Sequence, residues 1–374
     1  MKIIRIAFVV IFSVMTTFPY LNMEFNFVPD IELEKKQEIA EKPTLQLDEF
    51  YNYLDKYTSY FNDNYGFRNV LVNANAQIKY WILKKSPLTD KVLIGKEGWL
   101  FLSPSIDMII SEKMDYLDPG LFKIMEDSLL SKTRQFSKMG IKYYVMITPE
   151  KSYSCREMLP DQYDAQRIKK RFDTFVKRLE SNPELNIINV NDLINQSRLA
   201  SKDTLHFRYD SHWNSLGAFP VYQHILETLQ KDFPAIEVRN KIDYKQTFLN
   251  SSHGDLSDII NVGKYLYDKE YKLTCVGRNS VIDESVFTAE CKETYEFRNA
   301  KNKDKPDILF LHDSFGLPLK PWLINDFHQV HSLWVLAYNF DVNMLSQLRP
   351  DVVVHELAPR NTPLFKILLE YNLN

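Results

Sequence analysis

The sequence has little glycine, little cysteine and almost no net charge, and each shortage excludes a class of function. Its 374 residues include 10 glycines and no GxGxxG or GxxxxGKS/T pattern, so a loop that cradles phosphate groups is not expected. The 3 cysteines form no CxxC pair, which argues against a zinc site. With 46 basic and 49 acidic side chains, the formal charge of −3 provides no general attraction to nucleic acid.

The rest of the composition is that of an ordinary globular protein. Apolar residues make up 45% and charged residues 25% of the chain, which excludes a disordered, collagen-like or coiled-coil protein. The length suits two or more domains, or one large α/β domain. Aromatic residues reach 13%, so a surface on which sugar rings stack is one function to consider.

The N-terminus predicts export. Lys2 and Arg5 precede an uncharged run from Ile6 to Phe18, the pattern of a secretory signal or an uncleaved signal anchor. No Ala-x-Ala cleavage pattern follows, which favours an anchor over residues 1–22, with a buried N-terminal helix as the alternative. The charged residues within 23–46 indicate a solvated linker, so we expect the main domain to begin at residue 47.

Export also bears on the cysteines. Cys275 and Cys291 lie in a polar, strand-like region and can form one disulfide in an oxidising compartment. Cys155 is then left over. The pairing depends on spacing alone.

From about residue 119 the sequence alternates between helical and strand patterns. We expect helices over 119–139, 168–179 and 215–232, and short apolar strands over 142–148, 185–190, 307–311, 332–336 and 351–355. Strands that are apolar throughout and are separated by helices indicate an α/β fold with a mostly parallel sheet covered on both faces. Residues 238–300 interrupt this alternation and are expected to form an insertion.

Ser314 is a candidate nucleophile. It lies in His312-Asp-Ser-Phe-Gly316, directly after a predicted strand, and ligands of open parallel sheets bind at the carboxyl ends of strands. A serine at a strand-to-helix turn is exposed, and its backbone N–H can help to hold an oxyanion. The alternative is that Asp313 or Ser314 caps a helix.

Asp210 and His212 are a candidate acid and base. In Tyr209-Asp-Ser-His-Trp213 the carboxylate lies two residues from the imidazole and can orient it, as a serine nucleophile requires. One alternative is a metal site with His206, although no third ligand has a recognisable spacing; the other is a polar cap on the next helix. Because that third ligand is missing, we expect no metal here. Asn214 or Ser215 is the better N-cap, which leaves Asp210 and His212 without an obvious structural role.

Four further residues are candidate substrate-binding groups. Lys151 and Arg360 each follow a predicted strand and can bind a polar substrate or support the site, with surface ion pairing as the alternative. Trp213 and Tyr209 flank the acid and base and are aromatic, as sugar-binding residues often are.

Six motifs, in order over most of the chain, resemble the AlgJ/AlgX-like family of periplasmic, SGNH-hydrolase-like polysaccharide O-acetyltransferases. They are Phe61-Asn-Asp-Asn-Tyr-Gly-Phe-Arg68, Val92-Leu-Ile-Gly-Lys-Glu-Gly-Trp-Leu-Phe101, Pro149-Glu-Lys151, Asp210-Ser-His-Trp213, Asp313-Ser-Phe315 and Pro350-Asp-Val-Val-Val-His-Glu356 with Arg360. One position departs from the family pattern, because relatives commonly have glycine where this chain has His312.

The resemblance implies an SGNH-like three-layer α/β/α domain over 47–374. Ser314 would be the nucleophile, with His212 as base and Asp210 as acid. The resemblance also implies a reaction without a bound cofactor, in which a membrane-bound O-acyltransferase supplies the acetyl group and an exported polysaccharide receives it. The protein would be held at the periplasmic side of the inner membrane. Two other functions fit the same residues: a carbohydrate acetylesterase, and an inactive polysaccharide-binding or assembly protein.

Overall fold

The computed structural model describes most of the chain. The described residues are 2–29, 31, 40–45, 50–110, 118–201, 203–238, 240, 244–251, 254–275, 282–286, 295–299, 302–334, 345 and 348–361. Tertiary contacts divide the chain into two compact units, one of residues 1–89 with 257–266 and one of residues 90–256 with 267–374. This division differs from the predicted one, in which the main domain starts at residue 47.

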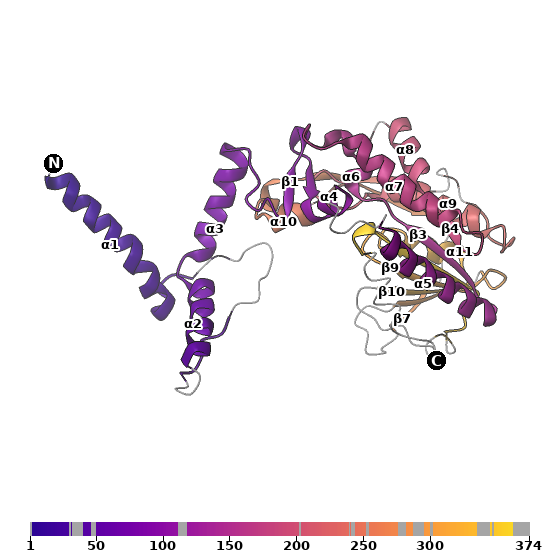
Figure 1. Cartoon of the computed structure of the whole chain (residues 1–374), viewed down its shortest axis with the longest axis horizontal. Coiled ribbons are helices and arrows are strands. Elements are labelled where there is room, and N and C mark those ends of the chain that lie inside the picture. The colour runs from indigo at the N-terminus through magenta and orange to yellow at the C-terminus, as the bar shows by residue number, and fades with distance from the viewer. Residues whose placement is uncertain are drawn as a thin grey trace. The chain divides into compact units, whose positions relative to one another are not determined.

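The first unit begins with a long apolar helix. Helix α1 (Lys2–Phe25) contains the basic residues and the apolar run, and its segment Ile3–Phe25 is long and apolar enough to cross a membrane, as a signal sequence also is. Among its described residues this unit also contains α2 (Phe50–Asn64) and α3 (Arg68–Gln77), which Figure 1 labels. The π-helix η2 (Ile78–Ile82) and the 3-10 helix η7 (Gly263–Tyr265) belong to it as well.

The segment before α3 packs tightly within the first unit. A Cβ atom on Gly66 would lie 2.2 Å from the carbonyl oxygen of Pro19, so only glycine fits there. The next residue, Phe67, has a φ of 62° and stacks on Phe18 of α1 with ring centroids 5.5 Å apart. The first motif of the family pattern therefore joins α1 to the helices that follow it.

The second unit is built on a mostly parallel sheet, as predicted. Its strand order is β4-β3-β11-β9-β10-β8-β7. The strands β4 (Asn186–Ile188), β3 (Lys142–Ile147), β11 (Val352–Leu357), β9 (Ile308–His312) and β10 (Gln329–Trp334) are parallel. Strand β8 (Tyr295–Asn299) pairs antiparallel with β10, and β7 (Ile282–Val286) pairs antiparallel with β8. The last two strands belong to the region predicted as an insertion, so part of that region extends the sheet.

Helices cover both faces of this sheet. Tyr143, Val145 and Ile147 of β3 pack on the face covered by α5 (Pro119–Lys138), α7 (Ala165–Glu180) and α4 (Ser103–Ile110). Tyr144 and Met146 pack on the opposite face, under α8 (Asn191–Ala200), α9 (Ser215–Leu229) and α11 (Lys320–Asp326). The second unit is therefore the expected three-layer α/β/α sandwich. The apolar strand pattern predicts this arrangement, because a strand that is buried on both faces must be apolar at successive positions.

The helix boundaries follow local signals. Asp164 accepts hydrogen bonds from Gln166 N and Arg167 N at the start of α7, and Asn214 accepts from Leu216 N and Gly217 N at the start of α9, which confirms Asn214 as the predicted N-cap. Gly140, with a φ of 78°, ends the α5 region as its position predicts.

Shorter elements complete the second unit. Two antiparallel hairpins pair β1 (Val92–Ile94) with β2 (Leu100–Leu102) and β5 (Tyr244–Ser251) with β6 (Asp268–Cys275). The short helices described in this unit are η3 (Lys96–Gly98), α6 (Lys151–Ser154), η5 (Arg156–Met158) and η9 (Pro359–Asn361), and α10 (Asp255–Ile259) begins in this unit and ends in the first. Cys155 is buried and free, whereas Cys291, one partner of the predicted disulfide, lies outside the described residues.

Candidate active site

Three neighbouring strands end at one edge of the sheet, and each is followed by a predicted site residue. Strands β3, β11 and β9 lie side by side and are parallel. Lys151 follows β3, Arg360 follows β11 and Ser314 follows β9. Because ligands bind at the carboxyl ends of such strands, the topology gathers these residues where the sequence predicts a site.

Asp210 and His212 form a tight pair. His212 Nδ1 lies 2.6 Å from Asp210 Oδ1, and the same oxygen accepts a hydrogen bond of 2.8 Å from the backbone N–H of His212. Burial by itself would lower the pKa of His212, but the hydrogen bond and charge of Asp210, with the charge of Asp255, raise it above its usual value. The carboxylate therefore favours the tautomer with a proton on Nδ1, which leaves Nε2 as the basic nitrogen.

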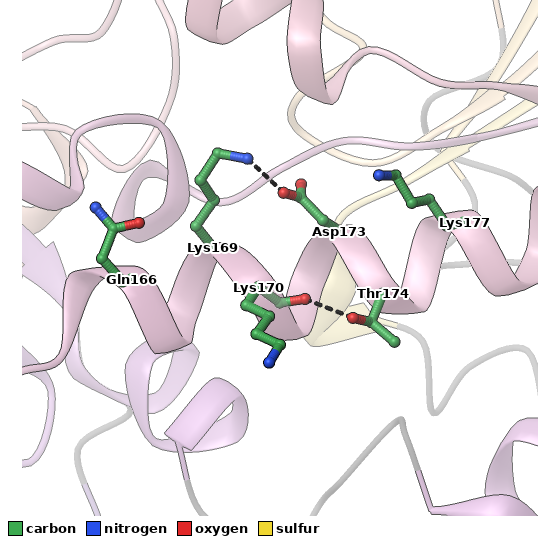
Figure 2. Close-up of a pocket in the computed structure, with 6 residues that line it drawn as sticks. All are labelled: Gln166, Lys169, Lys170, Asp173, Thr174 and Lys177. Atoms are coloured by element: carbon green, nitrogen blue, oxygen red, sulfur yellow. Dashed lines mark hydrogen bonds and ion pairs between the residues drawn. The ribbon is translucent and has the colours of Figure 1, made fainter.

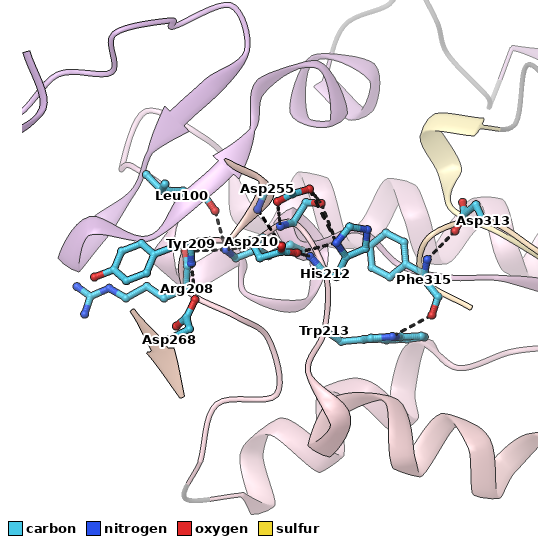
Figure 3. A network of polar contacts seen from close by, with 12 residues as sticks. Leu100, Arg208, Tyr209, Asp210, His212, Trp213, Asp255, Asp268, Asp313 and Phe315 are labelled. Atoms are coloured by element: carbon cyan, nitrogen blue, oxygen red, sulfur yellow. Dashed lines mark hydrogen bonds and ion pairs between the residues drawn. The ribbon is translucent and has the colours of Figure 1, made fainter. Parts of the chain in front are cut away.

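The imidazole of His212 packs against the segment that carries Ser314. His212 Nε2 is buried and has no hydrogen-bond partner among the described residues. The imidazole lies against Phe315, the residue after Ser314, with ring centroids 4.9 Å apart, and Figure 3 shows the two rings side by side. The hydrogen bond from Ser314 to Nε2 is not formed in this structure, and such bonds are often long in enzymes without substrate.

Ser314 lies in a turn, and no helix begins directly after it. Strand β9 ends at His312, residues 314–319 form a turn, and α11 begins at Lys320. The prediction of an immediate strand-to-helix junction is therefore wrong. The cause is Asp313, whose Oδ1 accepts from Phe315 N at 2.9 Å and whose carbonyl accepts from Gly316 N at 3.1 Å, which closes a tight turn around Ser314.

Asp313 also joins two strand ends. Its Oδ2 accepts hydrogen bonds from Ala358 N at 2.8 Å and from Asn361 Nδ2 at 2.6 Å, both of which follow β11. The side chain is fully buried. Asp313 thus has a structural role, as the alternative interpretation of this motif predicts. That role is different from the predicted helix cap, because the side chain binds the turn to the residues after β11.

His312 is accommodated by the glycine that follows the turn. A Cβ atom on Gly316 would lie 2.4 Å from His312 Cβ, so the histidine ring occupies the space that a larger residue at 316 would need. The ring is buried and bonds through Nδ1 to the carbonyl of Asp313 at 2.7 Å and through Nε2 to Ser332 Oγ at 2.8 Å. The chain therefore tolerates a side chain where relatives commonly have glycine.

Trp213 connects the loop that carries His212 to the turn that carries Ser314. Its indole Nε1 donates a hydrogen bond of 3.1 Å to the carbonyl of Phe315, and the two rings meet edge to face with centroids 5.4 Å apart. Trp213 is fully buried, so this structure gives it a positioning role and offers no support for the predicted substrate contact.

Lys151 has a comparable positioning role. Its ammonium group donates hydrogen bonds to the backbone carbonyls of Leu100 at 2.6 Å, Arg208 at 2.9 Å and Asp210 at 2.9 Å, and the side chain is 3% exposed. Burial lowers its pKa to about 8. With all three protons donated to the backbone, Lys151 supports the loop that carries Asp210 and has no proton left for a substrate.

The hairpin motif completes this support. The rings of Trp99 and Phe101 lie 5.0 Å and 5.2 Å from the Lys151 ammonium group, a cation–π arrangement. Leu100 N donates to the carbonyl of Arg208 at 3.0 Å. Two motifs that are distant in sequence from the loop that carries Asp210 thus converge on it through one buried lysine.

We expect Lys151→Met to destabilise the second unit by about 1–3 kcal/mol, because three buried carbonyls lose their donor. The measurement is denaturant unfolding of the full chain, followed by tryptophan fluorescence. The matched control is Lys177→Met on the exposed face of α7, where a surface change should stay within about 0.5 kcal/mol. Equal stability of the two variants would contradict the supporting role of Lys151.

Arg360 forms a buried ion pair beside the site. Its Nη1 lies 2.9 Å from Glu150 Oε2, and its guanidinium group lies 5.3 Å from the ring centroid of Phe315. Glu150 Oε1 is buried and has no partner among the described residues, and burial raises the pKa of this carboxyl group. Arg360 is thus held by Glu150 next to the turn that carries Ser314.

Of the two aromatic residues predicted to contact substrate, Tyr209 is more accessible to solvent than Trp213. It is half-buried, whereas Trp213 is not exposed at all. Its backbone N–H donates to Asp268 Oδ2 at 2.8 Å, and the Arg208 guanidinium group lies 5.6 Å from its ring centroid. Tyr209 therefore stays a candidate for substrate contact.

The possible metal ligands in the structure differ from those that the sequence suggests, because Asp255 takes the place of His206. His206 is buried, neither ring nitrogen has a partner among the described residues, and burial lowers its pKa to about 3. The side chains that approach one another as ligands would are those of Asp210, His212 and Asp255, whose ligand atoms lie within 4.8 Å of one another. The Asp210 and Asp255 oxygens already accept hydrogen bonds from protein groups, so the cluster is complete without an ion. The expectation of no metal stays a prediction.

Sequence reasoning missed two carboxylates that the predicted insertion contributes. Asp255 accepts hydrogen bonds from Ser211 N and Ser211 Oγ, and Asp268 accepts from Tyr209 N. Figure 3 shows both residues around the loop that carries Asp210. No signal in the sequence marks them, because an isolated aspartate in a polar region has many other uses.

A hollow of about 300 Å³ lies elsewhere, on the outer face of α7 (Figure 2). Its side chains pair along the helix, with Lys169 bound to Asp173, and Thr174 Oγ1 donating to the carbonyl of Lys170 at 2.7 Å. None of the candidate catalytic residues lines it. The hollow is lined by polar and charged side chains on the outer face of the amphipathic helix α7, so we assign it no role in the candidate site.

Solved structures with the same fold include that of Bacillus cereus PatB1, at 17% identity and a TM-score of 0.55, covering 72% of this chain and 96% of PatB1. The PatB1 structure with a sulfonyl adduct gives 18% identity, a TM-score of 0.56 and coverage of 72% and 95%. The O-acetyltransferase domain of Pseudomonas putida AlgJ gives 15% identity, a TM-score of 0.47 and coverage of 73% and 93%. No curated protein matches the chain.

The family comparison is more specific. The model described as SGNH hydrolase-like domain, acetyltransferase AlgX, matches residues 92–285. This segment includes the β1–β2 hairpin, Lys151 and the loop with Asp210 and His212, and it ends before Ser314. Because the match covers more than half of the chain, the chain belongs to the AlgX family of SGNH hydrolase-like acetyltransferases.

Proposed function

We propose that this protein is an O-acetyltransferase that acetylates an exported polysaccharide through an acyl-enzyme on Ser314. The observation that carries the proposal is the Asp210–His212 pair, whose imidazole has an unpartnered Nε2 and packs on Phe315, the residue after Ser314. Membership of an acetyltransferase family supports the reaction class. The polysaccharide acceptor is inferred from the resemblance of the motifs.

In the first step Ser314 takes the acetyl group. His212 Nε2 removes the hydroxyl proton as Oγ attacks the acetyl carbonyl of the donor ester, and the proton then passes from Nε2 to the leaving alkoxide. Asp210 stabilises the imidazolium that forms between these transfers. The products are acetyl-Ser314 and the donor alcohol.

In the second step a sugar hydroxyl takes the acetyl group. His212 Nε2 removes the proton of that hydroxyl, whose oxygen attacks the acetyl carbonyl, and the proton returns to Ser314 Oγ as the ester bond to the enzyme breaks. Each step passes through an oxyanion. The backbone N–H of Ser314 and the Arg360 guanidinium group are the donors that we propose for it, and one such donor contributes about 10²–10³-fold to turnover.

We further propose that the protein acts outside the cytoplasm, anchored in the inner membrane by α1. The apolar segment Ile3–Phe25 and the periplasmic setting of the family that the motifs resemble support this. A membrane-bound O-acyltransferase is the proposed acetyl donor, because acetyl coenzyme A is not expected in that compartment. An anchored enzyme would stay next to such a donor.

An acetyl-transfer assay tests this function. The full chain in detergent receives an activated acetyl ester, with or without an oligosaccharide acceptor, next to Ser314→Ala. Acetylated sugar that depends on Ser314 supports the transferase. Acetate release that ignores the acceptor supports the alternative, a carbohydrate acetylesterase. If neither assay shows a reaction that depends on Ser314, both enzymatic functions are excluded and an inactive polysaccharide-binding or assembly protein is the function that remains.

The rate should fall on the acid side of neutrality. His212 must be neutral to accept a proton, and its pKa is raised above the usual 6.5, so kcat/KM should increase as the pH rises through that raised value. Asp210 does not limit this range, because the hydrogen bond and charge of His212 outweigh burial and hold its pKa below the usual value. A pH–rate profile measures the effect, and an acid limb centred well below pH 6.5 would contradict it.

A further inference from the structure

The segment that contains Asp255 is built closely onto the catalytic loop. A Cβ atom on Gly254 would lie 2.5 Å from the backbone carbon and oxygen of Tyr209 and 2.6 Å from Asp210 N. Real Cβ contacts are never this short, so only glycine lets the two backbones approach. Residues 254–255 are therefore shaped to fit the loop that carries the acid and the base.

The two segments exchange hydrogen bonds. Asp255 N donates to Asp210 Oδ2 at 2.9 Å, so the catalytic acid holds the backbone of Asp255. In return Asp255 Oδ1 accepts from Ser211 N at 2.7 Å, and its Oδ2 accepts from Ser211 Oγ at 2.6 Å. Each carboxylate thus fixes the backbone of the other segment, and Figure 3 shows Asp255 next to Asp210.

The second carboxylate also faces the base. Asp255 Oδ2 lies 3.8 Å from His212 Nδ1, and Ser211 Oγ lies 3.3 Å from the same nitrogen. We propose that Asp255 is a second positioning carboxylate of this site, which orients the Asp210–His212 pair through Ser211 and adds negative charge next to the imidazole. The proposal rests on the proposed function for its catalytic meaning, but its effect on His212 is measurable without turnover.

Charged groups of both signs surround the imidazole. The titratable or charged residues that influence His212 are Asp210, Asp255, Arg360, Glu150 and His206. Arg360 opposes the positive imidazolium, whereas Asp210 and Asp255 favour it. Burial and the charge of Asp210 raise the pKa of Asp255, and the hydrogen bonds from Ser211 oppose that increase. Removing the Asp255 charge should therefore lower the pKa of His212.

The test is a titration of the full chain labelled with ¹³C-histidine, followed by NMR. Asp255→Asn should lower the pKa of His212 by about one unit, the size expected for losing a charge within 4–6 Å. The acid limb of the pH–rate profile should move to lower pH by the same amount, and kcat/KM at its plateau should fall about ten- to one hundredfold through misplacement of the base.

The control is Asp268→Asn, which removes a carboxylate that holds the same loop through Tyr209 N. It should leave the His212 pKa unchanged. Asp255→Glu keeps the negative charge, so the pKa of His212 should stay close to its value in the unsubstituted chain. This second variant keeps the proposal testable if Asp255→Asn fails to fold. An unchanged His212 pKa in a folded Asp255→Asn variant would overturn the proposal.

A metal is the competing explanation for the same cluster. Activity that is lost with a chelator and restored by zinc would overturn the proposal, because Asp255 would then be a ligand. A chain that shows no acetyl transfer but does show the His212 shift would overturn the proposed function alone.

Discussion

Replacing Ser314 with alanine should lower kcat/KM for acetyl transfer by about 10⁴- to 10⁶-fold, because without the hydroxyl no acyl-enzyme forms. Removing any other group would only weaken the two transfer steps, whereas this change removes the atom that accepts the acetyl group. The measurement is acetylated oligosaccharide formed from an activated acetyl ester. The matched control is Ser137→Ala on the exposed side of α5, which should keep full activity.

Covalent labelling separates loss of the nucleophile from loss of binding. A sulfonyl fluoride reacts with an activated serine as Oγ bonds to sulfur and fluoride leaves. Mass spectrometry should find one sulfonyl group per chain, on the peptide that contains Ser314, and none in Ser314→Ala. Labelling of another serine, or activity that survives in Ser314→Ala, would contradict the assignment of Ser314.

Replacing Asp210 with asparagine should lower kcat/KM by about 10⁴-fold, a loss typical of removing the carboxylate that orients a catalytic histidine. The amide no longer favours the Nδ1–H tautomer that the 2.6 Å bond enforces, and the imidazolium loses its partner. The His212 pKa should fall as well. The NMR titration described for Asp255 measures this change together with the rate.

Asp304→Asn is the matched control for this change. Asp304 is exposed, and the substitution alters the net charge of the chain by the same amount. It should change neither the rate nor the His212 pKa. An Asp210→Asn chain that is folded and retains more than about a tenth of the rate would remove Asp210 from the mechanism.

The sequence predicts the sheet better than the site. Strand β3 is apolar at every position from Tyr143 to Ile147, which only a strand buried on both faces requires, so its pattern is sufficient to place it. The Asp210–His212 pair was also predictable, because two residues within one loop are close in any fold. Ser314 is different, since it lies about a hundred residues further on and its nearness to His212 depends on the packing of Phe315 and Trp213.

The predicted substrate-binding residues show why the rest was out of reach. Lys151 and Trp213 have the chemistry of surface contacts, yet both are buried and bonded to backbone carbonyls. Trp213 lies in a loop and Lys151 begins α6, a helix of 4 residues, and neither segment is long enough to leave a periodic pattern of burial in the sequence. The same limit hides Asp255, which begins the 5-residue helix α10 and whose partners are the backbone and hydroxyl groups of Ser211.

The sequence by itself therefore determined the α/β class, the closeness of Asp210 to His212 and the family that its motifs resemble, and it predicts an N-terminal signal or anchor. These follow from local composition, from periodicity and from short motifs. Only the tertiary structure decided that the scarce glycines matter at specific contacts, such as Gly254 against the loop that carries Asp210 and Gly316 against His312. Such contacts join chain segments far apart in sequence, where only packing determines which atoms meet.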